Sequence, residues 1–169
     1  MSTETQEAVE MGTKPVQEHG WLRHLIGEWR VENEMTMAPD QPKMRSEGRE
    51  SVKDLGGLWA FAVGESKMPN GASMSYYAAL GFDVSFRKYR GCWFASVSSH
   101  LWVQEGQLSA DGKILTLNCV GPSMTKDGET ANYRFEFEIV DNNHRTMTEY
   151  GQDDNGQWQE FIKSRYTRV

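Results

Sequence analysis

The spacing of apolar residues changes near residue 27 of the chain. Before that point, four apolar side chains recur at offsets of one, four and five, which is the spacing of one helical stripe. They are Trp21, Leu22, Leu25 and Ile26. Pro15 is tolerated in a first helical turn, and Gly27 can form a left-handed cap without steric cost. The pattern therefore predicts one short helix over residues 15–26.

From Trp29 to the C-terminus the period is close to two, which is typical of strands. In residues 29–37 one face is mainly apolar and the other is charged or polar. The mainly apolar face carries Trp29, Val31, Asn33, Met35 and Met37. Asn-Gly or Asp-Gly dipeptides at 70–71, 111–112, 127–128 and 155–156 favour tight hairpins. Between the turns the sequence predicts strands at residues 29–37, 44–55, 57–67, 72–82, 86–97, 101–109, 113–121, 130–140, 144–151 and 157–167.

About ten consecutive strands with a single helix make parallel crossovers improbable, because each crossover needs a long connection. A long antiparallel meander tends to close on itself, which removes its exposed edges. We therefore expect an all-β, antiparallel up-and-down barrel with the helix over one end. A β-sandwich is the alternative. Residues 1–13 are polar and unpatterned and are expected to form a mobile tail, with one domain over 14–169.

Composition narrows the classes of function. The formal net charge of −6, with no stripe of Lys and Arg to offset it, argues against a nucleic-acid partner. No apolar run approaches the roughly 18 residues of a membrane helix, and the acidic start lacks an apolar signal segment, so a cytoplasmic location is expected. Cys92 and Cys119 stand alone in apolar runs and are interpreted as buried free thiols, with a disulfide or a reactive thiol as alternatives.

Several short motifs resemble one family. Gly27-Glu28-Trp29, between helix and first strand, resembles the Gly-x-Trp signature of lipocalin-like (calycin) barrels. The chain as a whole resembles a bacterial domain-of-unknown-function family of that superfamily, number fifteen seventy-nine. The matching stretches fall at residues 18–22, 27–29, 55–59, 80–83, 100–103, 105–106, 121–122, 144–146 and 166–168. The resemblance implies a barrel with a small-molecule cavity and implies no reaction. It also places Arg168, or failing it Arg165, over the Trp29 indole.

Alternation within each predicted strand indicates which side chains face the lumen. The residues assigned to it include Met35, Trp59, Phe61, Tyr76, Tyr133 and Phe135. Val63, Met74, Ala78, Leu80, Leu115, Leu117, Cys119, Phe137 and Ile139 share these faces. Such an aromatic and Met-rich lining suits a small apolar ligand, although the same side chains could simply fill the barrel.

Polar residues on the inward face are candidates for chemistry. Asn33 and Glu50 fall on that face, and Glu50 could orient a ligand or act as a base. A register slip would instead turn Glu50 to solvent. His100 follows a run of serines that predicts a turn, so we place it at a rim of the barrel. There it could serve as a gate, a base or a haem ligand, or could simply bond a neighbouring strand.

No spacing typical of a metal site, a calcium loop, a phosphate loop or a dinucleotide site occurs, so neither metal nor cofactor is predicted. The leading hypothesis is a non-enzymatic barrel that binds a small, largely apolar molecule. The alternatives are an enzyme that uses Glu50 or His100 as acid or base, and a haem-binding barrel. The protein could be a monomer or a homodimer, since alternation predicts that Leu58, Ala60 and Ala62 form an apolar outer face on one strand.

Overall fold

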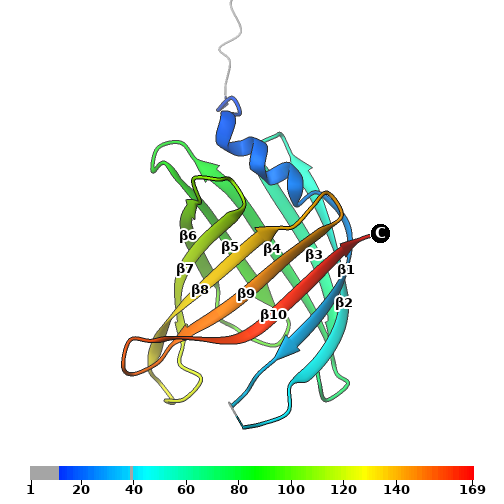
Figure 1. Cartoon of the computed structure of the whole chain (residues 1–169). Coiled ribbons are helices and arrows are strands. Elements are labelled where there is room, and N and C mark those ends of the chain that lie inside the picture. Colours follow the sequence, from blue (N-terminus) through cyan, green and yellow to red (C-terminus); the bar gives the residue numbers. More distant parts are fainter. Residues whose placement is uncertain (1–11, 39) are drawn as a thin grey trace, which may run out of the picture.

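Ten strands run up and down in chain order and close into a barrel, with a short helix across one end (Figure 1). The computed structural model describes residues 12–38 and 40–169, so most of the expected tail at 1–13 lies outside the described residues. The elements are η1 (Gln17–His24), β1 (Gly27–Met35), β2 (Met44–Leu55), β3 (Trp59–Lys67), β4 (Ser73–Asp83), β5 (Lys88–Ala95), β6 (Trp102–Leu108), β7 (Ile114–Pro122), β8 (Thr130–Ile139), β9 (His144–Gln152) and β10 (Trp158–Arg168). The predicted barrel is confirmed.

Strand β1 closes the sheet by pairing antiparallel with both β2 and β10. Trp29 lies opposite Glu50 of β2 and opposite Arg168 of β10. Both edges of the sheet, β1 and β10, are therefore paired with each other. A closed barrel has no free edge strand that could pair with another molecule. The hairpin glycines have the positive φ angles that their dipeptides predict, for example +83° at Gly71 and +77° at Gly156.

The helix differs from the expectation in type and length. It is a 3-10 helix that begins at Gln17 and is shorter than the predicted span of residues 15–26. His19, Leu22 and Leu25 are three residues apart and are all buried, which matches the three-residue turn of a 3-10 helix. The Tyr89 hydroxyl donates to the Glu18 carbonyl at 2.6 Å, and the Trp21 indole donates to the Gly112 carbonyl at 3.0 Å. These hydrogen bonds to the barrel stabilise the 3-10 helix. Sequence periodicity could not predict them, because they join residues far apart in the chain.

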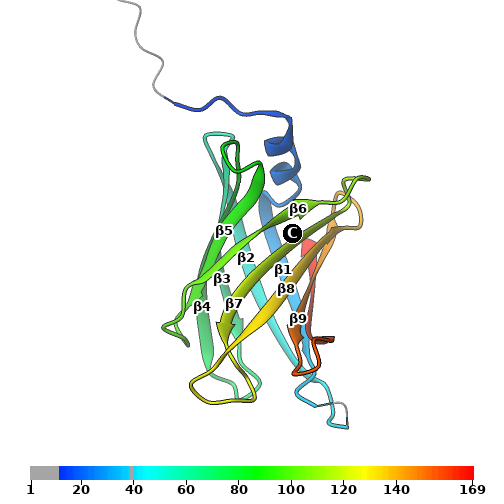
Figure 2. The ribbon, with the colours of Figure 1, turned by 90° about the vertical axis from the view of Figure 1, so that its left-hand side faces the viewer.

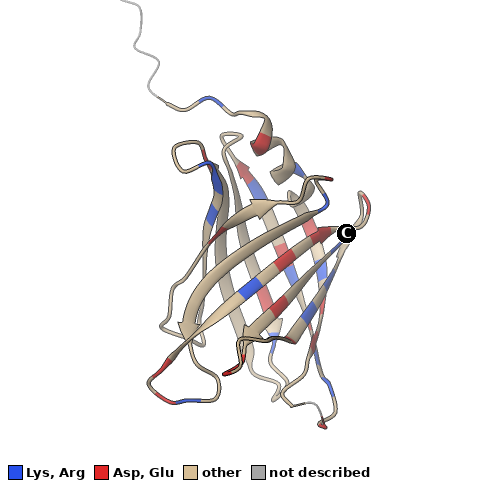
Figure 3. Ribbon diagram, turned by 60° about the vertical axis from the view of Figure 1, so that its left-hand side comes forward, with Lys and Arg blue, Asp and Glu red and all other residues tan. Residues whose placement is uncertain are grey.

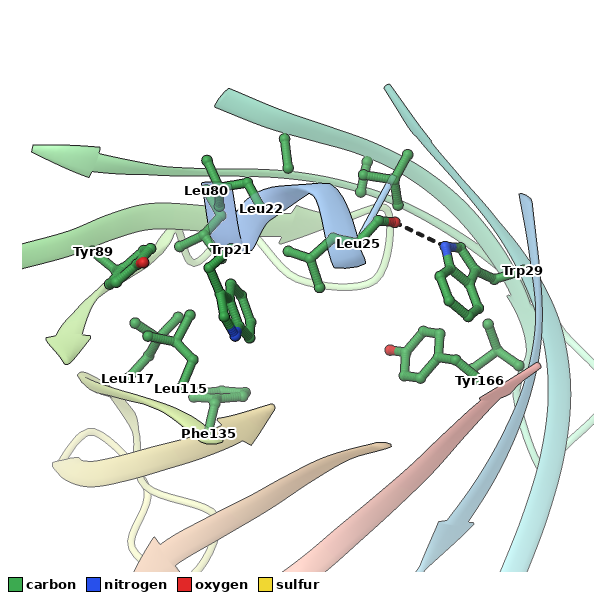
Figure 4. Packing of buried hydrophobic residues seen from close by; sticks show 14 of the residues in the cluster. Trp21, Leu22, Leu25, Trp29, Leu80, Tyr89, Leu115, Leu117, Phe135 and Tyr166 are labelled. Atoms are coloured by element: carbon green, nitrogen blue, oxygen red, sulfur yellow. Dashed lines mark hydrogen bonds between the residues drawn. The ribbon is translucent and has the colours of Figure 1, made fainter. Parts of the chain in front are cut away.

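The helix plugs its end of the barrel with a dense apolar core (Figure 4). Trp21, Leu22 and Leu25 belong to one buried apolar cluster with Leu115 and Leu117, which are fully buried. The Trp29 indole donates to the Leu25 carbonyl at 2.8 Å, so the helix end is bonded to the first strand. Figure 2 shows the helix at one end of the barrel and a set of hairpin loops at the other. The barrel therefore has one closed end.

The prediction for β3 was wrong in its orientation. Trp59, Phe61 and Val63 lie on the outside of the barrel, about 40 % exposed, while Ala60 and Ala62 are buried inside. Both faces of this strand are apolar, so alternation alone could not choose between them, and a shift of one residue exchanges the faces. The small side chains face inward, where space is needed for the helix and for Tyr76. The prediction that Ala60 and Ala62 lie on an apolar outer face is wrong for the same reason, since both are buried inside.

Candidate functional site

A cavity of about 1200 Å³ occupies the barrel below the plug. It extends from Leu25 and Val52 near the helix to the loops at the opposite end, where Met37, Met68 and Met124 lie beside it. These loops connect β1 to β2, β3 to β4 and β7 to β8. The cavity is therefore closed at the helix end and reaches the surface at the loop end.

A buried ion pair lies on the cavity wall. The Arg145 guanidinium of β9 donates to one oxygen of Glu50, and the Tyr76 hydroxyl donates to the other oxygen at 2.7 Å. The Arg145 guanidinium also lies over the rings of Trp29 and Tyr166, at 4.6 and 3.8 Å from their centroids. Burial is the largest cause that raises the pKa of Tyr76 and of Tyr166, and the negative charge of Glu50 contributes.

A glycine makes the Tyr76–Glu50 contact possible. Glu50 of β2, Gly64 of β3 and Tyr76 of β4 form one row across three strands. A Cβ atom at position 64 would overlap the Tyr76 ring. The ring therefore crosses the empty position above Gly64 to reach the carboxylate two strands away.

A second polar group lies nearer the open end, two inward-facing residue pairs from Glu50 along β1 and β2. The Ser164 hydroxyl donates to the Asn33 side-chain oxygen at 2.6 Å, and the Asn33 amide donates to Ser46 at 3.2 Å and to Ser66 at 3.3 Å. These four side chains satisfy one another across β10, β1, β2 and β3. They are uncharged and present hydroxyl and amide groups to the cavity.

The remaining walls are largely aromatic. Trp102, Tyr133 and Phe161 are in edge contact, with centroids 5.0 and 6.0 Å apart in successive pairs. Trp93 and Phe135 also line the cavity. The Tyr133 hydroxyl donates to the Pro122 carbonyl at 2.5 Å, so its polar end is satisfied and its ring faces the lumen.

Glu149 of β9 also lines the cavity and differs from Glu50 in having no partner. Within the described residues, no hydrogen bond or ion pair involves its carboxylate, whereas protein donors hold both oxygens of Glu50. Burial raises the pKa of Glu149 to about 8. A carboxyl group with such a pKa can give up or take up a proton near neutral pH.

Most of the predicted lumen residues do line the cavity. Those that do are Asn33, Met35, Glu50, Tyr76, Tyr133 and Phe135. Glu50 is 8 % exposed, so the alternative in which a register slip turns it to solvent is wrong. Trp59 and Phe61 are not part of the lining, because they are on the outer face of β3.

His100 is at the rim, as predicted, but does not line the cavity. It follows β5 in the connection to β6, at the loop end of the barrel. Its ring Nε2 lies 3.2 Å from the Val120 carbonyl of β7, and the ring packs edge-on against Trp102. The interpretation in which His100 bonds a neighbouring strand is confirmed. His100 was also a candidate for contact with a ligand in the lumen, and that part of the prediction is wrong because His100 is not in the cavity lining.

Sequence analysis missed Arg145, Glu149, Ser164 and Tyr166, all of which face the cavity. In β9 polar residues occupy both faces, so alternation gave no sign of which face is inside. Arg145 and Tyr166 fall in the family-matching stretches 144–146 and 166–168, but those matches do not indicate which way a side chain faces. That the two residues lie opposite each other across β9 and β10 becomes visible only once the register is known.

The two cysteines are free, as predicted; Cys119 is buried and Cys92 is half-buried. Burial, with the charge of Glu149, raises the pKa of the Cys119 thiol to about 12, so it is protonated and unreactive at neutral pH. Residues 12–38 and 40–169 contain no group of three potential metal ligands. The helix of the described region is too short and too polar to cross a membrane.

Comparison with solved structures finds other barrels of this shape. The protein Rv2717c from M. tuberculosis superposes with a TM-score of 0.63 at 12 % identity, covering 92 % of this chain and 99 % of that one. The S-type phycobiliprotein lyase CPES from Guillardia theta superposes with a TM-score of 0.61 at 11 % identity, covering 91 % of this chain and 93 % of that one. At such low identity these matches establish the fold alone.

Sequence comparison identifies the family. No curated protein sequence matches this chain. A family model described as "Protein of unknown function (DUF1579)" matches residues 14–168, which include every strand of the barrel. The motifs of the sequence analysis fall within that match, so the chain belongs to the DUF1579 family.

Proposed function

We propose that this protein binds one small, largely apolar molecule inside its barrel. The cavity carries this proposal: it is about 1200 Å³, above the roughly 300–1000 Å³ typical of small-ligand sites. It has a closed end, aromatic and methionine walls, and a few polar groups, which together provide apolar burial and orientation for a ligand.

The enzymatic and haem alternatives have less support. Both oxygens of Glu50 accept hydrogen bonds from Arg145 and Tyr76, which favours a structural role over that of a general base. The haem hypothesis required an inward histidine with an open position, and His100 lies outside the cavity lining with its Nε2 at the Val120 carbonyl. We therefore retain binding as the proposed function.

A titration with N-phenyl-1-naphthylamine, a neutral fluorescent probe, tests the proposal. We expect saturable binding near one probe per chain. Ala62→Phe places a ring inside the cavity and should weaken binding at least tenfold. Val63→Phe, one residue away on the outer face, should leave the affinity unchanged.

Two further measurements keep the test decisive. Circular dichroism tests whether both variants are folded. If Ala62→Phe is not folded, Ala78→Phe on β4 is a second variant that fills the cavity. Native mass spectrometry of the freshly purified protein looks for retained small molecules. Absence of both probe binding and retained mass would overturn the proposal.

A further inference from the structure

Glu149 is an acidic group that faces the cavity and whose charge the described protein does not neutralise. We propose that the cavity selects ligands with a protonated amine, and that the Glu149 carboxylate binds the ammonium group. This inference rests on the proposed function and specifies the class of ligand. Three independent features support it: the charge balance of the cavity, the charges at its mouth and its aromatic walls.

The first feature is the charge balance inside the barrel. Arg145 and Glu50 form an ion pair and cancel each other. Asn33 and its hydroxyl partners are neutral. An ionised Glu149 therefore leaves the interior with one uncompensated negative charge, which is costly in an apolar environment. A ligand ammonium would remove that cost by forming a charge-assisted hydrogen bond, whereas a ligand carboxylate would increase it.

The second feature is the mouth of the cavity. Acidic side chains along the lining at or near the loop end outnumber basic ones: they are Glu65, Glu129, Asp153, Asp154 and Glu160. The basic residue among the lining loops, Lys126, is already paired with Asp154 at 2.7 Å and with Glu129 at 3.9 Å. Figure 3 shows acidic segments in loops at this end. A cleft lined by one sign of charge concentrates ligands of the opposite sign.

The third feature is the aromatic wall. Phe135 is paired with Glu149 across β8 and β9, and Tyr133 lies two residues before Phe135 on the same face. Ring faces attract cations, with a preference for Trp and Tyr. The protein already uses this interaction inside the barrel, where the Arg145 guanidinium lies over Trp29 and Tyr166. The rings can thus hold both the apolar body and the cationic end of an amphipathic amine.

The proposal has a pH signature. Glu149 is protonated below its pKa of about 8, so ammonium binding must release that proton. The apparent affinity for an alkylammonium should therefore rise by up to tenfold per pH unit between pH 6 and 8, and then level off. Besides the mouth residues named above, the titratable or charged groups that line the cavity are Glu50 of β2, Tyr76 of β4, Cys92 of β5, Tyr133 of β8, Arg145 of β9 and Tyr166 of β10. Cys119 of β7 lies close enough to Glu149 for their charges to interact. The pKa of each of Tyr76, Cys119, Tyr133 and Tyr166 is raised, away from this window.

The experiment is displacement of N-phenyl-1-naphthylamine by three ten-carbon compounds: decylamine, decan-1-ol and decanoate. At pH 8.5 we expect decylamine to bind at least tenfold more tightly than decanol, and decanoate more weakly than both. Glu149→Gln should abolish the preference for decylamine and its pH dependence. Glu138→Gln, an exposed glutamate on the outer face of β8, is the matched control and should change neither.

The outcomes separate this inference from the proposed function. If the probe does not bind wild-type protein, the proposed function fails. If the probe binds but decylamine and decanol compete equally, the cavity binds apolar molecules and the amine inference is wrong. Decanol binding by Glu149→Gln shows that the variant's cavity is intact, so a lost preference cannot come from misfolding. A preference for decylamine that survives in Glu149→Gln would also overturn the assignment.

Discussion

Because Gly64 has no side chain, Tyr76 of β4 can reach Glu50 of β2 across β3. The neighbours of Gly64 in the same row are Glu50 and Tyr76, and the Tyr76 ring occupies the space that a Cβ atom would fill. The φ angle of Gly64 is not positive, so steric room rather than backbone conformation requires glycine here. The arrangement holds the Glu50 carboxylate between a hydroxyl and a guanidinium.

The first prediction follows from this fit. Gly64→Ala should destabilise the protein by about 1–3 kcal/mol, because overpacking moves the Tyr76 ring from the carboxylate. The same change in a Tyr76→Ala background should cost much less, because the obstructing ring is gone. Urea unfolding of the four proteins gives the coupling energy. Additive costs would show that Gly64 does not act through Tyr76.

At the scale of elements, one junction ties the helix, the first strand and the last strand together. Arg168 of β10 lies over the Trp29 indole, 4.2 Å from the ring centroid, as the family resemblance predicted. Its guanidinium also donates to the Ile26 carbonyl at 2.6 Å and to the Asn142 carbonyl at 2.9 Å. Gly27, with φ +134°, is needed here because a Cβ atom would overlap this guanidinium.

The second prediction concerns this junction. Trp29→Ala should cost about 3–5 kcal/mol, because it empties a site that is 2 % exposed. Arg168→Ala should cost less, about 1–3 kcal/mol, for the lost cation–π contact and hydrogen bonds. Arg168→Lys keeps the charge but cannot hold both carbonyls, so its stability should lie between those of the wild type and Arg168→Ala. Thermal unfolding measures these three variants and a fourth, Arg165→Ala, which removes an exposed arginine of β10. An equal cost for Trp29→Ala and Arg165→Ala would contradict this account.

At the scale of the whole molecule, closure of the sheet and plugging of one end create an interior that water reaches only from the loops. An acid inside such a barrel is poorly solvated, which is why the pKa of Glu149 is raised from 4.5 to about 8. Neither β9 nor its neighbours would produce this effect alone, since it depends on the complete enclosure.

The third prediction is the resulting pH dependence of stability. Between pH 4.5 and about 8 the Glu149 carboxyl is protonated in the folded state and ionised in the unfolded state, so folding stability falls as pH rises through this range. The loss should amount to roughly 2–4 kcal/mol. Glu149→Gln should remove it and should be more stable than the wild type at pH 8.5.

Denaturant unfolding at pH 5 and at pH 8.5 checks this prediction. Glu138→Gln serves as the reference, because Glu138 is exposed on the outer face of β8. A wild type whose stability responds to pH like that of Glu149→Gln would mean that Glu149 is well solvated in the folded state.

Much of the architecture was predictable because it depends on local patterns. The switch from helical to strand periodicity at Gly27, the turn dipeptides and the alternation of β1 and β8 gave the ten strands, the plug and the inward positions of Asn33, Tyr133 and Phe135. In these strands one face is apolar and the other polar, so hydrophobic burial determines the orientation.

The tertiary structure alone decided the rest. In β3 both faces are apolar and in β9 both are partly polar, so only the space available inside the barrel placed Phe61 outside and Glu149 inside. Arg145 and Glu50 are 95 residues apart, and their pairing exists only because β9 and β2 belong to one closed sheet. A sequence specifies which residues prefer burial, whereas the enclosed volume and the partners across it determine which polar groups are satisfied and which remain for a ligand.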